Sequence, residues 1–125
     1  MRVAARRGAK TGAMGISVEP LALPLADEAV DALVELRRAT DAVSNPDDPP
    51  VAADELVPDL FDDRPSERLS VWLARRDGRA VGLAVAGVDV EGDNVGHAEV
   101  ELDVHPDARG ADVEVASIAA VVPWL

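Results

Sequence analysis

The sequence predicts an α/β fold of the α+β kind, with mostly antiparallel strands and flanking helices in the order β-α-α-β-β-β-α. Three segments of alternating apolar and polar residues are separated only by Asp77-Gly78 and by the turn at 91–94, as in consecutive hairpins. Segments with apolar residues at helical spacing precede these strands, and a segment of small residues that predicts a helix follows them. We therefore expect one domain over residues 16–125, which is the default for a chain of 125 residues.

The segment 1–15 stands apart from this domain. It contains three arginines and one lysine but no acidic residue, and no apolar stretch typical of a signal peptide follows it. We expect a disordered, basic N-terminal tail. Two alternatives stay open: a transit peptide, which an arginine-rich and acid-free start also fits, and an upstream start with Met14 as the natural first residue.

One strand and two helices are expected before the hairpins. Residues 16–23 predict a short strand, and Pro20 favours a place at the edge of the sheet. A helix is expected over 27–43 with Asp27 as its N-cap, because apolar residues then recur at helical spacing. After the linker SNPDDPP, a shorter helix is expected over 52–61.

Three strands are expected next, over 68–75, 80–90 and 95–104. Alternation in the first of them predicts that Trp72 lies on the polar face, away from the leucines and valine. A helix over 111–122 ends the pattern. Its apolar residues are too many for one narrow stripe, so part of its apolar surface is expected to lack a packing partner.

Composition limits the classes of function. The formal net charge is −12 and the pI is about 4.4, which argues against nucleic acid or an anionic membrane as partner. The sequence has no cysteine, so it offers no disulfide and no thiolate, and a cytoplasmic location is expected. No apolar run approaches the roughly 20 residues that a membrane-spanning helix needs.

The stretch 100–117, VELDVHPDARGADVEVAS, is the most informative part of the sequence. A strand ending at Val104 runs into His105-Pro106, then a tight turn, then a segment of small residues that predicts a helix. A strand, a turn and a helix N-terminus in succession allow backbone N–H groups to converge on an anion.

This stretch resembles the acyl-CoA-binding motif of the GNAT superfamily of N-acyltransferases, in which V-x-P-x-x-R-G precedes R-x-x-G-x-G/A. Residues 76–84, RDGRAVGLA, also resemble a hairpin that recurs in that family. The resemblance implies a partial, incomplete GNAT-type fold, acetyl-CoA as cosubstrate, and transfer of an acetyl group to an amine. It implies the following cosubstrate-binding residues: Leu102, Val104, Arg109, Gly110, Ala111, Asp112, Val113, Glu114 and Val115.

Two acidic residues depart from the motif. Asp112 and Glu114 stand where the family has glycines, which let the backbone approach the pyrophosphate. A carboxylate about 5 Å from a phosphate costs about 1–3 kcal/mol at effective dielectric constants of 20–80. Acids in the first turn of a helix also stabilise it, so both effects can operate together. We therefore expect acetyl-CoA to bind weakly or not at all. The sequence also lacks tyrosine, which in the family often supplies the catalytic acid.

A row of titratable residues marks the last expected strand. His97, Glu99, Glu101, Asp103 and His105 alternate and so share one face. The resemblance implies that Glu99, or as second choice Glu101, deprotonates the acceptor amine, which needs a carboxylate in reach of the ammonium proton. The alternative is a solvated polar face. Alternating strand residues are a weak metal signature, so no metal is expected.

Two classes of function stay open on these grounds. The first is an N-acetyltransferase acting on an amine, and the acidic surface favours a cationic acceptor. The second is a catalytically inactive remnant or an acidic interaction module. For either class, an exposed sheet edge after the strand 95–104 is expected to permit limited self-association.

Overall fold

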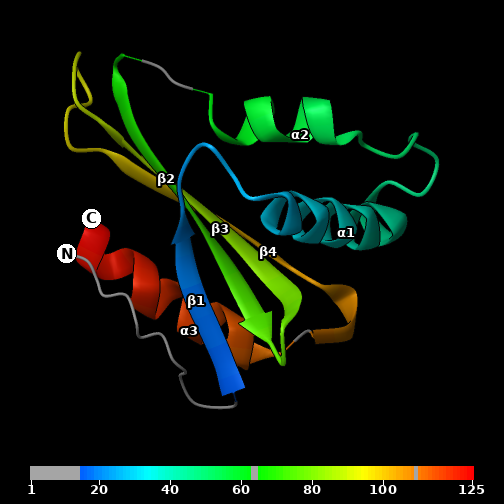
Figure 1. The fold of residues 1–125 in the computed structure, drawn as a ribbon. Helices are drawn as coiled ribbons and strands as arrows, with labels where there is room; N and C mark the ends of the chain where they lie inside the picture. The colour runs from blue at the N-terminus through cyan, green and yellow to red at the C-terminus, as the bar shows by residue number, and fades with distance from the viewer. Residues whose placement is uncertain (1–14, 63–64, 109) are drawn as a thin grey trace.

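The computed structural model describes residues 15–62, 65–108 and 110–125, and the predicted order of elements and α+β fold class are confirmed (Figure 1). The predicted tail falls outside these residues, except for Gly15. The elements are β1 (Ile16–Leu21), α1 (Asp27–Ser44), α2 (Ala53–Leu60), β2 (Glu67–Arg76), β3 (Arg79–Asp89), β4 (Ala98–Val104), a 3₁₀ turn at Pro106–Ala108, α3 (Ala111–Val121) and a 3₁₀ turn at Val122–Trp124.

The strands form one antiparallel sheet in the order β1-β2-β3-β4. The β2–β3 hairpin closes at Asp77 (φ 54°) and Gly78 (φ 81°), which is the type I′ conformation that the Asp-Gly pair predicts. β1 lies at one edge, as Pro20 led us to expect. At the other edge is β4, which carries the predicted functional residues.

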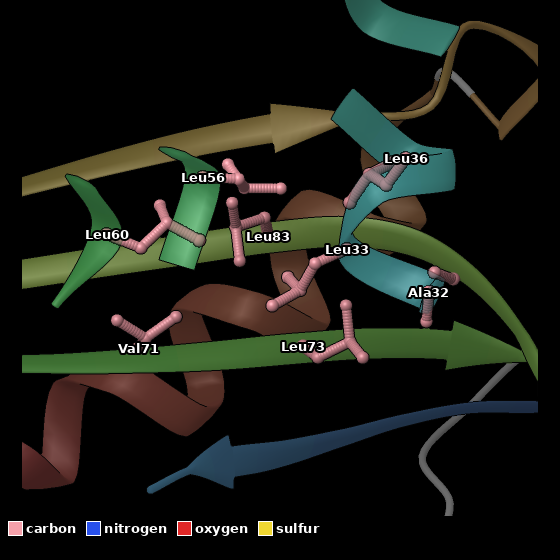
Figure 2. Packing of buried hydrophobic residues seen from close by; sticks show 9 residues of the cluster. Ala32, Leu33, Leu36, Leu56, Leu60, Val71, Leu73 and Leu83 are labelled. Atoms are coloured by element: carbon pink, nitrogen blue, oxygen red, sulfur yellow. The ribbon is translucent and has the colours of Figure 1, made fainter. Parts of the chain in front are cut away.

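Both faces of the sheet are covered by helices, as Figure 1 shows. α1 and α2 pack on one face, where leucines from both helices meet Val71, Leu73 and Leu83 of the sheet (Figure 2). α3 packs on the opposite face through Val113 and Val121, against side chains of β1, β2 and β3. This two-sided burial makes the sheet the centre of the core.

Trp72 lies on the face of β2 opposite Val71 and Leu73, as the alternation predicts, but this face is not solvated. Trp72 is buried because α3 covers that face, and its ring packs edge-on against Trp124, with centroids 5.4 Å apart. The Arg68 guanidinium lies 4.2 Å from the centroid of the Trp124 ring and donates a hydrogen bond of 2.9 Å to the Trp124 carbonyl. Arg68 and Trp72 of β2 thus hold the 3₁₀ turn that follows α3 against the sheet.

Two local predictions also need correction. The N-cap of α1 is Ala26 rather than Asp27. Asp27 is the first helical residue, and no side-chain hydrogen bond caps the helix. β4 begins at Ala98 rather than at residue 95, because Gly96 has φ 88° and the chain turns there. Val95 is consequently exposed in the turn instead of pairing in the sheet.

Arg75 ties three elements together near the β2–β3 hairpin. Its guanidinium makes a two-pronged ion pair with Glu28 of α1 (2.6 and 2.9 Å) and a further one with Glu19 of β1 (3.2 Å). It also donates to the Gly78 carbonyl at 3.2 Å. Burial lowers the pKa of Arg75, but the hydrogen bonds and charges of Glu28 and Glu19 outweigh it and leave the pKa raised. Arg75 therefore stays charged while its partners are ionised.

Within the ranges that the structure describes, no helix is long and apolar enough to cross a membrane.

Candidate functional site

The turn between β4 and α3 presents backbone N–H groups at the start of a helix. Gly110 is the N-cap of α3, with φ 136° and ψ 177°, a conformation that favours glycine, and no side chain caps the helix. The first N–H groups of a helix have no partner within it and attract anions. Because a Cβ at Gly110 would meet nothing within 4 Å, the space in front of the turn is open.

His105 holds this turn in place. Its backbone N–H donates to the Val81 carbonyl (2.8 Å) and its carbonyl accepts from the Ala108 N–H (2.9 Å). The ring is buried and its Nδ1 accepts a hydrogen bond of 3.0 Å from the Asp107 N–H. His105 thus leaves the exposed face on which Glu99, Glu101 and Asp103 lie, and serves the turn instead.

Two arginines that the motif did not indicate lie beside the turn. Arg76 Nη2 is 3.8 Å from Asp112 Oδ2, and Arg79 Nη2 is 2.9 Å from His105 Nε2 and 3.5 Å from Asp107 Oδ2. Both belong to the β2–β3 hairpin. Since β3 begins where antiparallel β4 ends, the sequence R-D-G-R at 76–79 carried a signal for this placement.

The residues that the motif implies for cosubstrate binding have different surroundings. Gly110, Ala111, Asp112, Glu114 and Val115 are exposed around the start of α3. Leu102 and Val104 are partly buried and pack towards α3, and Val113 is fully buried against Ile16, Ala74 and Val81. Arg109 lies outside the described residues.

The backbone of the turn suits a phosphate, but two of its side chains do not. Its N–H groups and the glycine N-cap suit an anion. The side chain of Val113 is buried and cannot contact a ligand, so Val113 can contribute only its backbone N–H. The carboxylates of Asp112 and Glu114 oppose an anion, although the ion pair with Arg76 neutralises part of the charge of Asp112.

Glu99 and Glu101 lie on the face of the sheet on which α1 and α2 pack. They line a cleft of about 650 Å³ together with three further carboxylates, Asp59, Asp62 and Glu67. Leu60, Leu69 and Val85 supply apolar walls, and Arg37 is the one cation among the described residues that line the cleft. Such a cleft attracts cations.

The cleft and the turn are linked by β4 itself. At about 3.3 Å per residue, Glu101 lies about 10 Å and Glu99 about 17 Å along the strand from Val104, where the turn begins. Among the described residues no group of three or more histidine, aspartate or glutamate side chains is placed to hold a metal ion.

The fold described above is similar to that of a solved structure. No protein-family model matches the sequence, and no curated protein sequence matches it either. The similar structure is a tandem GNAT protein from the clavulanic acid biosynthesis pathway, determined without AcCoA, with 27% sequence identity and a TM-score of 0.63. The match covers 83% of this chain and 31% of that chain. The fold is therefore GNAT-like, and the chain spans under a third of the similar protein.

Proposed function

We propose that this chain carries the acyl-CoA-binding turn and the amine-activating carboxylates of an N-acetyltransferase. One observation supports this most directly. A single strand of a GNAT-like fold, β4, carries exposed carboxylates in an acidic cleft and ends in a glycine-capped helix N-terminus. The first feature suits a cationic amine, and the second suits a phosphate.

Each part has a distinct role in this proposal. The N–H groups at the start of α3 bind the pyrophosphate, and Arg76 and Arg79 offset the nearby acids. Acetyl-CoA supplies an acyl group activated as a thioester. Glu99, or Glu101 in its place, accepts the ammonium proton, so that the free amine can attack the thioester carbonyl. The C–S bond then breaks, and CoA leaves as a thiol after its thiolate takes up the proton that the acylated nitrogen loses.

Calorimetric titration with acetyl-CoA tests the phosphate site. We expect no site tighter than about 10 μM in the unaltered chain, because Asp112 and Glu114 repel the pyrophosphate. Replacing both with glycine should strengthen binding at least tenfold. A matched control, Asp31→Gly with Glu35→Gly on the exposed side of α1, removes the same charge and should have little effect.

Thiol release from acetyl-CoA in the presence of a diamine tests the base. Glu99→Gln should lower the rate at least tenfold if Glu99 is the base, and Glu101→Gln should do so if Glu101 is. Activity that survives both changes would contradict the proposed role.

A second candidate is an inactive interaction module. The acids at the start of α3 favour it, since they oppose the anion that the turn would bind. No acetyl-CoA binding even after both acids become glycine would support this candidate over an enzyme.

A further inference from the structure

Gly87 leaves room in the floor of the cleft, and the side chain of Glu67 occupies that room. Gly87 is buried within β3 and lines the cleft, and Glu67 lies diagonally across from it, since Glu67 is in register with Asp89. A Cβ at Gly87 would lie 2.8 Å from Cδ of Glu67 and closer still to its Oε2. The Glu67 carboxylate therefore lies where a side chain at position 87 would otherwise project.

The register of the sheet brings this carboxylate beside Glu99. Gly87 pairs with Leu69 of β2 on one side and with Glu99 of β4 on the other. Directly opposite residues have Cβ atoms about 4.5–5.5 Å apart, so the Glu67 carboxylate lies at about this distance from the Cβ of Glu99. An ammonium group that bonds to two oxygens at about 2.8 Å spans about 4.5 Å between them. Both carboxylates are thus within reach of one ammonium group.

The protein does not neutralise these two carboxylates. Among the residues that the structure describes, no basic side chain forms an ion pair with Glu67 or Glu99, and this includes Arg37 in the same cleft. Like charges this close repel each other, and a cation bound between them relieves the repulsion.

Apolar side chains continue the cleft beside the two carboxylates. Leu69 lies directly opposite Gly87, and Val85 is the next residue of β3 on the same face. Leu60 of α2 lines the cleft as well. Charged groups that fix one end of a ligand, next to apolar walls, suit an ammonium group on an alkyl chain.

We propose that Glu67 is an acceptor-binding residue, which holds the ammonium group of an aliphatic primary amine over Gly87 together with Glu99. This rests on the proposed function, in which Glu99 accepts the ammonium proton. Glu67 stays ionised and accepts a hydrogen bond from a remaining N–H, so that the neutral amine is kept at the site. A primary ammonium group has three N–H donors, enough for both carboxylates. The alkyl chain lies along Leu69 and Val85.

Titration with an amine alone tests this without acetyl-CoA, so the outcome does not depend on catalysis. The probe is n-pentylamine, followed through the amide chemical shifts of the ¹⁵N-labelled chain. We expect saturable shifts centred on Gly87 and Leu69. The trimethylated derivative of the probe has the same charge but no N–H donor, and it should bind at least fivefold more weakly. Equal binding of the two cations, or no saturable binding of pentylamine, would overturn the proposal.

Three variants separate the position of the Glu67 carboxylate from its charge. Glu67→Gln removes the charge, Glu67→Asp withdraws it from Gly87 by one methylene group, and Gly87→Ala places a Cβ where the carboxylate lies. Each should weaken pentylamine binding at least fivefold. Asp59→Asn, which removes a carboxylate of α2 that lines the same cleft, should change it less than threefold. Circular dichroism checks that all four fold. Unchanged binding by Glu67→Asp would show that the cleft attracts amines by charge alone and that the proposal is wrong.

Acetyl transfer to pentylamine distinguishes failure of this inference from failure of the proposed function. Glu67→Gln should raise KM for the amine at least fivefold and change kcat less than threefold, whereas Glu99→Gln should lower kcat. Transfer that needs Glu99 but is unaffected by Glu67→Gln would refute the role of Glu67 and leave the proposed function intact. Amine binding that needs Glu67, without any transfer, would support the role of Glu67 in binding and refute the enzymatic function.

Discussion

Gly82 of β3 sets how closely α3 approaches the sheet. A Cβ at this position would lie 2.5 Å from Cγ1 of Val113, and also 3.4 Å from the Ala74 Cβ and from the Asp103 carbonyl oxygen. Val113 is fully buried in the first turn of α3, beside the N–H groups of the candidate phosphate site. Gly82→Ala therefore perturbs the packing that positions this helix N-terminus.

Two opposing effects decide the sign of the change in stability. Alanine in a strand interior is favoured over glycine by about 0.5–1 kcal/mol. A contact at 2.5 Å is too short, and a β-branched valine in a helix has essentially one rotamer, so the helix must move. Overpacking of this kind costs about 1–3 kcal/mol, and we expect a net loss of about 1–2 kcal/mol.

Urea denaturation followed by the fluorescence of Trp72 and Trp124 measures this loss. Val113→Ala alone should cost about 2–3 kcal/mol by loss of two buried methyl groups and the remaining cavity. The double variant should be at least 1 kcal/mol more stable than the sum of the single losses predicts, because the clash is then removed.

A second β3 glycine supplies the matched control. The three atoms nearest to a Cβ at Gly87 all belong to the side chain of Glu67, whose flexible end can move aside. Gly87→Ala should therefore be neutral or slightly stabilising. If Gly82→Ala behaves in the same way, or if its effect is additive with that of Val113→Ala, the contact does not limit the approach of α3.

Three further predictions concern arginines. Arg75→Ala should destabilise the fold by about 1–2 kcal/mol in urea denaturation, because it removes ion pairs that join β1, β2 and α1, and an unchanged midpoint would contradict this. Arg68→Ala should cost about 0.5–1 kcal/mol and alter the emission of Trp124, over which the guanidinium lies, and unchanged emission would show that this contact is not maintained in solution. Arg76→Ala should weaken acetyl-CoA binding roughly threefold to fivefold, or about 0.7–1 kcal/mol, since it leaves Asp112 unpaired, and tighter binding in calorimetry would refute this.

The sequence predicted the elements well because their signals are local. Asp77-Gly78 defines the tight hairpin, apolar spacing defines α1, and a run of small residues after the turn indicates α3. Gly96 was the exception, since Val95 has the composition of a strand residue but precedes a turn that needs a positive φ. The strand predicted from local composition therefore began three residues before β4 does.

Burial of Trp72 could not be predicted in the same way. Alternation shows which residues share a face of a strand, but it does not show whether the second face is covered. Only the position of α3, set by contacts between distant parts of the chain, buries that ring. Arg76 and Arg79 also lie more than 25 residues from the turn they adjoin, and their placement follows only once the pairing of β3 with β4 is considered.

The distribution of charge gives the site its polarity. The chain has 24 acidic residues and 12 basic ones, yet three arginines gather at the β2–β3 hairpin, two of them beside the start of α3. At the other end of β4 the cleft has five carboxylates and one arginine among its lining residues. One strand thus joins an end where cations offset nearby acids and an end where acids dominate. Under the proposed function, the phosphate groups of the cosubstrate and the cationic amine would therefore bind at different ends of β4.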